Sequence, residues 1–217
     1  MSTLLGHDSA GTGTLQTLVV LGQLDAFETI VADARLAPDL ARRTQLTRLG
    51  LLQFAPVDHL LETVDQAELA DTLAQALQGF HQYTPVTSWP QALVKAVVTS
   101  GMAGDLLSLV DPEASTEVDL RAVAVAHAEV GEWARAQLAD VLAEPGPETS
   151  RLALFARRML GEASAQAQRV AGRATDLTGM LTGHEPGSTD EIAATSDLIG
   201  RLVELSSRRL EELGLQP

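Results

Sequence analysis

Polar side chains interrupt the apolar stripes of four segments that are predicted to form long helices. These residues are Gln23, Gln53, Asp105 and His127. Each has apolar or small residues three or four positions away on both sides, and a helix turns about 100° per residue, so the polar side chain shares a face with those neighbours. The pattern predicts that two amides, an acid and an imidazole from four consecutive long helices point into the interior of a bundle.

A polar residue on each of four helices is the arrangement by which some bundles hold two irons, with a carboxylate from two helices and a Glu-x-x-His pair from each of the others. The corresponding positions in this chain are Gln23, Gln53, Pro56, Asp105, Ala124 and His127. The two glutamines are neutral amides, the proline stands where a histidine would be, and the alanine stands where a carboxylate would be. The remaining acid and imidazole cannot replace the roughly four carboxylates of such a centre. We therefore expect these positions to be vestigial, with no bound metal or other cofactor and no catalytic residue.

Two interpretations of these positions remain open. In the first, the glutamines, the acid and the imidazole form a hydrogen-bond network in the core, because a buried amide can pair with either group without a metal. In the second, a remodelled iron site recruits ligands from the segment after the second helix. Those candidates are Asp58, His59 and Glu62. Iron is an expected cofactor only in the second interpretation.

The composition favours a helical protein that is held together by packing. Apolar residues make up 45% of the 217 residues and aromatic residues only 3%, and Leu, Ala and Val dominate, which favours helices over sheets. The chain has no cysteine, which excludes disulfides and thiol catalysis. Its formal charge of −14 repels polyanions, so nucleic acid is not an expected partner. We find no signal-peptide pattern and no uninterrupted apolar run of roughly 18 residues, so we expect a cytoplasmic protein without a membrane partner.

Apolar spacing and capping signals define the expected elements. A flexible, Gly-rich lead over residues 1–13 precedes a single helical domain over residues 14–217. Pro56 is expected to kink or break the second helix near residues 52–56, because proline removes a backbone hydrogen bond. No segment shows the sustained alternation of a strand. The expected helices cover about residues 14–35, 38–60, 65–80, 88–110, 112–143, 147–181 and 188–213.

Several segments together resemble one family of proteins. They are Gly22–Phe27, Ala32–Pro38, Leu93–Ala96, Gly101–Asp105 and, most clearly, Arg157–Ala163 running into Gln166–Val170. With these segments the chain after residue 15 resembles the actinobacterial ferritin-like proteins that are grouped with the tRNA 2-methylthio-isopentenyladenosine hydroxylases, the MiaE-like family. The resemblance implies an all-α fold, a ferritin-like four-helix bundle with additional C-terminal helices. Members of that family are similar to non-haem di-iron monooxygenases, which hydroxylate an isopentenyl group on a tRNA base.

The resemblance also implies which positions have changed. The family pattern carries Glu at the position of Gln23, Glu-x-x-His at residues 53–56, an acid at Asp105 and an acidic-x-x-His at residues 124–127, so four of six ligand positions differ. A non-catalytic ferritin-like protein with a scaffold or binding role is the first hypothesis, and a residual non-haem iron oxygenase or hydroxylase is the alternative. The expected partners are a second copy of the chain, another protein or a small apolar ligand.

The segment from Arg157 to Val170 is expected to serve packing or a homodimer contact. Its alanine and glycine residues permit a close approach between helices. Within this segment Glu162 is expected to be a buried partner of Arg158.

Overall fold

A computed structural model describes residues 9–61, 67, 71, 77, 79–110, 117–143 and 146–216, and every regular element among them is helical. The long helices are α1 (Ser9–Asp33), α2 (Leu40–Phe54), α4 (Trp89–Leu109), α5 (Leu120–Leu142), α6 (Pro147–Ala171) and α8 (Thr189–Glu212). The shorter elements are α7 (Thr175–Thr182) and the 3-10 turns η1 (Ala34–Leu36) and η2 (Asp58–Leu60). The expected all-α fold is therefore confirmed over these ranges.

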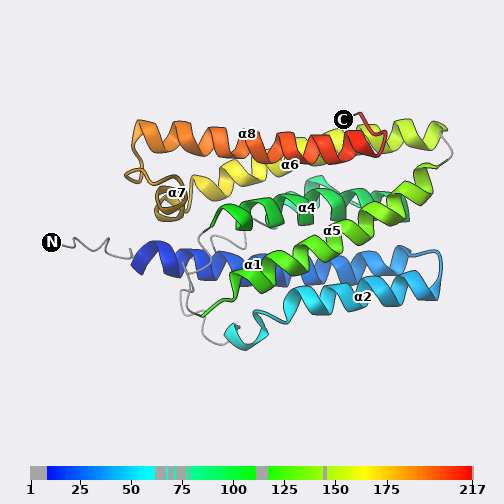
Figure 1. Ribbon diagram of the computed structural model, residues 1–217, viewed down its shortest axis with the longest axis horizontal. Coiled ribbons are helices and arrows are strands. Elements are labelled where there is room, and N and C mark those ends of the chain that lie inside the picture. The colour runs from blue at the N-terminus through cyan, green and yellow to red at the C-terminus, as the bar shows by residue number, and fades with distance from the viewer. Residues whose placement is uncertain are drawn as a thin grey trace.

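The direction of the helices distinguishes this bundle from a simple up-and-down arrangement. α1 and α2 are antiparallel, and so are α4 and α5, but α2 and α4 run in the same direction (Figure 1). The chain between α2 and α4 therefore returns from one end of the bundle to the other. One long crossover of this kind is typical of ferritin-like bundles.

α4 occupies the centre of the molecule. It packs most extensively against α5 and also contacts α6 and α8, while α1 packs against α2 and α7. In Figure 1, α6 and α8 lie on one side of α4, and α1 and α2 lie on the other. α1 and α4 make few contacts with each other. Space remains between these two helices, and the candidate site lies there.

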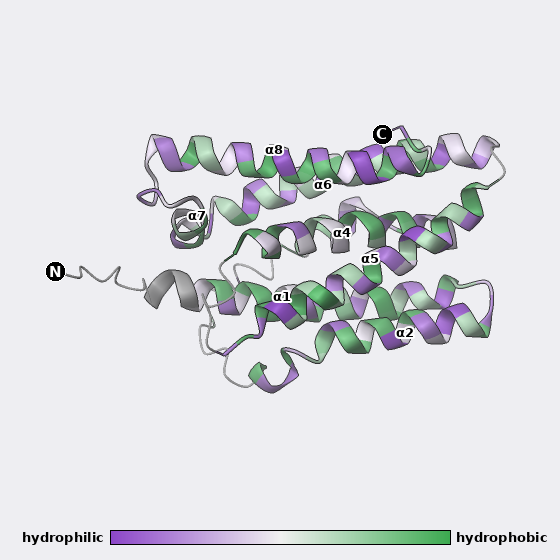
Figure 2. Ribbon diagram, viewed as in Figure 1, coloured by the Kyte–Doolittle hydropathy of each residue, from purple (hydrophilic) through white to green (hydrophobic). Residues whose placement is uncertain are grey.

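The apolar core is divided into two clusters. The larger cluster includes the fully buried side chains of Leu93, Leu138, Leu152 and Met159. The smaller cluster, around the N-terminal half of α1 and the start of α5, includes Val20, Val57, Val123 and Leu177. α8 alternates between hydrophilic and hydrophobic bands along its length, as a helix with one buried side should (Figure 2). The division of the core places a boundary in the middle of the bundle.

The expected break in the second helix is confirmed. α2 ends at Phe54, and Pro56 lies in the turn that follows it. The Ser188 side chain caps the last helix, since it accepts a hydrogen bond from the Glu191 backbone N–H at 3.1 Å. Ser88, by contrast, makes no capping bond with its side chain. Two boundaries of the second and last helices thus follow from local sequence signals.

The expected single helix over residues 147–181 is wrong. α6 ends at Ala171, and the short α7 follows after a turn that contains Gly172 and Ala174. Glycine has a low helix propensity, and Ala174 has φ −119° and ψ 56°, outside the helical region. The turn allows α7 to pack against α1.

Two further boundaries qualify the expectations. α1 begins at Ser9, earlier than expected, so residues 9–13 are helical. Most of the helix expected over residues 65–80 lies outside the described residues, although residues 79–83 are helical.

Two helical segments have the length and mean hydropathy of a membrane span. They are Gly13–Leu36 and Trp89–Leu109. Polar residues interrupt both segments, so the length of uninterrupted apolar runs had predicted no membrane span. Core helices of bundles pass the same test, and the charged residues Asp25 and Lys95 of these two segments both contact His81 inside the protein. Length and hydropathy therefore assign no membrane role here.

Substitution of two helical glycines tests the packing of α1 against α2. A Cβ atom at Gly50 would lie 3.0 Å from Cγ2 of Ile30, whereas a Cβ atom at Gly161 would meet nothing within 4 Å. We expect Gly50→Val to lower the free energy of unfolding by about 1–3 kcal/mol through overpacking. We expect Gly161→Ala to raise it by about 0.5–1 kcal/mol because alanine favours the helix. Urea unfolding measures both changes in the free energy of unfolding. Changes of the same sign would contradict the close approach of α1 and α2 at Gly50.

Candidate functional site

Three of the predicted polar residues lie at the boundary between the two apolar clusters. Along α1, α2 and α5, one cluster gives way to the other at Gln23, Gln53 and His127. The exposed fractions of these residues are 1%, 0% and 7%, respectively. We call these three residues the polar layer. The inward orientation expected from helical spacing is observed for each of them.

A direct hydrogen bond joins two members of the polar layer. The amide nitrogen of Gln53 lies 2.7 Å from Nδ1 of His127. Because an amide N–H is a donor, we assign Nδ1 as the acceptor, which places the ring proton of the neutral imidazole on Nε2. Burial lowers the pKa of His127 to about 4. The layer is therefore uncharged at neutral pH.

Gln23 is buried without a hydrogen-bond partner. Neither its amide nitrogen nor its amide oxygen has a partner among the described residues, and the amide oxygen of Gln53 has none either. A buried polar group without a partner typically costs about 1–3 kcal/mol of stability. The layer thus offers both a donor and two acceptors to a molecule that reaches it.

Asp105 does not join this layer, which corrects the expected network of four residues. Its carboxylate forms an ion pair with Arg209 of α8. The part of α4 that faces the polar layer carries Ala103 and Leu106, which line the same cavities as His127. Asp105 and Ala124 instead line a third cavity of about 240 Å³ beside Arg209, and His127 is the member of the polar layer that also lines it. The difference arises because α4 is surrounded by other helices, so an inward side chain can face α8 as well as α1 and α2.

The residues proposed for a remodelled iron site do not face the core. The side chains of Asp58 and His59 are 63% and 61% exposed, and 3.8 Å separates His59 Nδ1 from an Asp58 carboxylate oxygen. Both belong to η2, which follows the turn at Pro56. Glu62, the third candidate, lies outside the described residues. The histidine that was proposed to turn inward therefore points to solvent.

Two adjoining cavities meet at the polar layer. The first has a volume of about 260 Å³ and lies between α1, α4 and α6. The second has a volume of about 280 Å³ and extends toward α7 and α8. His127, Leu106 and Ala167 line both of them. These volumes are close to the lower end of the range for small-molecule sites, about 300 Å³.

The two cavities differ in polarity. The second is lined mainly by aliphatic side chains, including Leu15, Val19, Val110, Leu177 and Ile199. Its polar wall includes Gln23 and His127. The first cavity also has apolar walls, but one side of it carries charged groups.

The small residues of α6 face the first cavity. Ala163 and Ala167 both line it. The expected contact between Arg158 and Glu162 on this helix is wrong: Arg158 is exposed, and no ion pair joins the two in the described part of the chain. The role of α6 in a homodimer stays a prediction.

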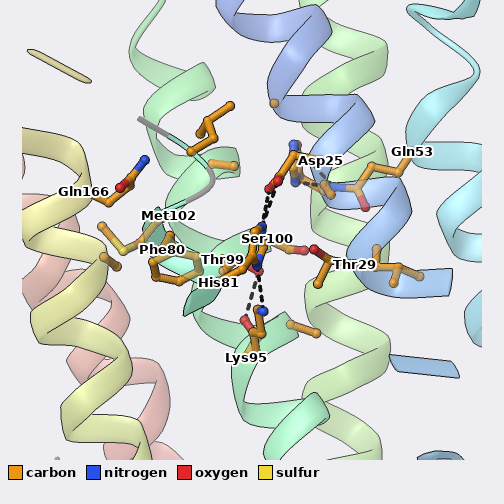
Figure 3. A pocket seen from close by; sticks show the side chains of 18 of the residues that line it. Asp25, Thr29, Gln53, Phe80, His81, Lys95, Thr99, Ser100, Met102 and Gln166 are labelled. Carbon is orange, nitrogen blue, oxygen red and sulfur yellow. Dashed lines mark hydrogen bonds and ion pairs between the residues drawn. The ribbon is translucent and has the colours of Figure 1, made fainter. Parts of the chain in front are cut away.

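The charged wall of the first cavity is a chain of three side chains. Nε2 of His81 lies 2.7 and 2.8 Å from the two carboxylate oxygens of Asp25. On the other side of the ring, Nδ1 lies 2.9 Å from the Lys95 ammonium nitrogen. Figure 3 shows His81 between these two partners, at the edge of the cavity. We call Asp25, His81 and Lys95 the charged triad.

Burial shifts the pKa values around the charged triad. It lowers the pKa of Lys95, although Asp33 and Asp25 oppose this effect by favouring the ammonium form. It raises the pKa of Asp33, which lines the same cavity, although Lys95 and His81 act in the opposite direction. Both shifts favour uncharged forms at this wall of the cavity.

The comparison with known families agrees with this architecture. Residues 9–184 match the family described as "Ferritin-like domain, actinomycetes". The chain belongs to this family. No curated protein matches the sequence significantly. The match includes α1, α2, α4, α5 and α6, and therefore the polar layer and the charged triad of this ferritin-like protein.

The donor set of this ferritin-like protein does not fit a di-iron centre. Within the described ranges, no three or more His, Cys, Asp or Glu side chains come together in a way that could hold a metal. The polar layer supplies two amides and one imidazole, and amides are neutral, weak ligands for iron. The acid that could have added a charge, Asp105, is held by Arg209. The chemistry of these side chains suits hydrogen bonding rather than iron coordination.

The sequence interpretation missed the charged triad. Lys95 had a signal that we did not use: it is the only lysine among 15 basic residues, and it interrupts an apolar helix. Asp25 and Asp33 had a weaker signal, because they stand in the family-like segments Gly22–Phe27 and Ala32–Pro38. Nothing in the sequence alone placed His81 between them.

The buried imidazole makes stability depend on pH. The pKa of His127 is about 4 in the folded protein, below its usual value of 6.5. Between these values the unfolded chain binds a proton that the native state does not, so the free energy of unfolding falls as pH falls. From pH 7 to pH 4.5 we expect this residue to contribute a loss on the order of 2–3 kcal/mol.

Urea unfolding of wild type, His127→Gln and His59→Gln across this pH range measures that contribution. The loss should shrink in His127→Gln and persist in His59→Gln, because the His59 side chain is exposed. Identical pH profiles for wild type and His127→Gln would contradict the low pKa.

Proposed function

We propose that this ferritin-like protein is a non-catalytic binding protein that has lost a di-iron centre of MiaE-like type and holds a small, mainly apolar molecule between α1, α4 and α6. The observation that carries the proposal is the position of the polar layer. Gln23, Gln53 and His127 occupy the middle of the bundle, where di-iron bundles place their ligands, and two cavities adjoin them.

The chemistry of the layer supports a neutral ligand with one polar group. Gln23 offers a donor and an acceptor that no described residue satisfies. Because the pKa of His127 is low, its imidazole is neutral at neutral pH, and the polar layer has no charge that would attract an ion. A hydroxyl, a carbonyl or a carboxamide could pair with these amides, and its apolar body would lie among the aliphatic side chains of the second cavity.

A hydrogen bond to the buried, unpaired amide of Gln23 explains why binding would be favourable. A ligand that pairs with Gln23 removes a penalty that the free protein bears. It also transfers apolar surface from water into the cavities, which contributes about 25 cal/mol per Å². The two effects act together only for a molecule that is both apolar and able to form a hydrogen bond.

Metal analysis tests the loss of the di-iron centre. We expect protein that is purified without chelator and exposed to ferrous iron in air to retain far less than one iron per chain, because the layer lacks carboxylates. The matched variant Gln23→Glu with Gln53→Glu places two carboxylates near His127, and we expect it to bind iron measurably in titration. Near-stoichiometric iron with oxo-bridge absorption in the wild type would overturn the proposal.

Binding of a fluorescent apolar amine, 1-aminoanthracene, tests the cavities. Ala167 lines both cavities, so Ala167→Phe fills their shared space, whereas the exposed Ala139 of α5 serves as the control position. We expect Ala167→Phe to weaken binding about tenfold or more, equal to about 1.4 kcal/mol, and Ala139→Phe to leave it unchanged. Saturable binding that both variants retain equally would show that the probe binds elsewhere.

A further inference from the structure

The only lysine of the chain is buried. Of the 15 basic residues, 14 are arginines, and the remaining one is Lys95 of α4, which is 5% exposed. Lysine is almost never fully buried unless it has a partner, because its ammonium group is strongly hydrated in water. A chain that uses arginine everywhere else has thus placed a primary amine at a cavity wall.

The partners of this amine form a chain that activates nucleophiles in other proteins. An imidazole within hydrogen-bond reach of a nucleophile, held in place by a third group, is the usual structural signature of covalent catalysis. Here the distance from Lys95 Nζ to His81 Nδ1 is 2.9 Å, and the Asp25 carboxylate accepts from Nε2 of the same ring at 2.7 Å. The carboxylate fixes the tautomer in which Nδ1 is free to accept a proton from the lysine.

The surroundings of Lys95 shift its amine toward the uncharged form. The cavity wall near Lys95 includes aliphatic side chains such as Leu46 and Leu106, whereas the Phe80 ring, whose centroid lies 5.7 Å from Nζ, favours the ammonium form. Burial lowers the pKa of Lys95, and the ionisable groups that face it are Asp25, Asp33 and His81. A larger fraction of the free amine is therefore present at neutral pH than in an exposed lysine.

We propose that Lys95 captures an aldehyde or ketone with an apolar body by forming a reversible imine in the first cavity. The inference rests on the proposed function in one respect, namely that the cavity admits a small apolar molecule. It goes beyond that function because it names a carbonyl compound as the ligand and a covalent bond as the mode of binding.

The steps balance without an oxidant or a further reactant. His81 accepts a proton from the Lys95 ammonium at Nδ1, and the amine lone pair then forms a C–N bond to the carbonyl carbon. The carbonyl oxygen takes up a proton from the nitrogen, which carries a positive charge after the addition. His81 then returns the proton that it accepted in the first step to the resulting hydroxyl, which leaves as water as the C=N bond forms. Ammonium plus carbonyl thus gives a protonated imine plus water, with no change in net charge. Asp25 stabilises the imidazolium that forms in the first step.

The cavity suits a carbonyl compound of modest size. Its volume of about 260 Å³ holds the apolar body against residues such as Ile30, Ala92 and Ala163. Asp33 lines the same space, and burial raises the pKa of its carboxyl, although Lys95 and His81 oppose this shift. Removal of water by these walls favours the imine, because water is the product of its formation.

Reductive trapping with hexanal and sodium cyanoborohydride tests the inference. The chain has a single ε-amine, so the only competing amine is the one at the N-terminus. We expect Lys95 in the folded protein to be alkylated faster than in the chain unfolded by guanidinium, because burial lowers its pKa and a lower pKa gives more free amine at neutral pH. Intact mass and peptide mapping measure the rate at each amine.

The variants separate activation from mere accessibility. Lys95→Arg keeps the charge and removes the reactive amine, and it should leave only N-terminal labelling. His81→Gln and Asp25→Asn should slow labelling of Lys95 and change its dependence on pH, an effect that a purely structural role would not produce, while the N-terminal amine of the same molecules keeps its wild-type rate. Because the comparison of folded with unfolded wild type needs no variant, the inference stays testable if a variant does not fold.

The outcomes also separate this inference from the proposed function. Labelling of Lys95 that is no faster in the folded than in the unfolded chain overturns the imine. If 1-aminoanthracene still binds in that case, the proposed binding function stands without the covalent step. If hexanal labels Lys95 no faster in the folded chain and 1-aminoanthracene does not bind, both proposals fail.

Discussion

The hydrogen bond between Gln53 and His127 is the constraint on which the interior of the bundle depends. It joins α2 to α5 at the level where the two apolar clusters meet, and it does so between neutral groups. A buried ion pair or a metal would need compensating charges from other helices, whereas an amide and an imidazole satisfy each other. The low pKa of His127 follows from its burial, and His127 lines both cavities.

The interior of this ferritin-like bundle contains two adjoining cavities beside the polar layer. The second cavity is a lipophilic chamber, and the first has an amine at one wall. A single elongated molecule could place its tail in the former, its middle at Gln23 and its reactive end beside Lys95. In this proposal the unpaired amide and the buried lysine serve one ligand rather than two unrelated sites.

The residues differ in how far their environment could be predicted from the sequence. Gln23, Gln53 and His127 were placed correctly in the core because helical periodicity alone fixes which face a residue occupies. Periodicity could not show which neighbour that face meets, so Asp105 was assigned to the wrong cluster and instead pairs with Arg209. The charged triad joins helix α1, residues 79–83 and α4, and no local pattern encodes such a contact. Gly172 stands in the sequence where α6 ends, but glycine also occurs within helices, so its presence did not predict that α6 would end there.

The distribution of basic residues gives the protein an unusual surface. All cationic side chains other than Lys95 are guanidinium groups, which remain protonated and do not form imines or amides under physiological conditions. Acylating agents and reactive carbonyls that modify exposed lysines of other proteins find none on the outside of this one, since its sole lysine is 5% exposed. The composition thus gives chemical selectivity before any recognition occurs: among the side chains, amine chemistry is confined to the interior of the bundle.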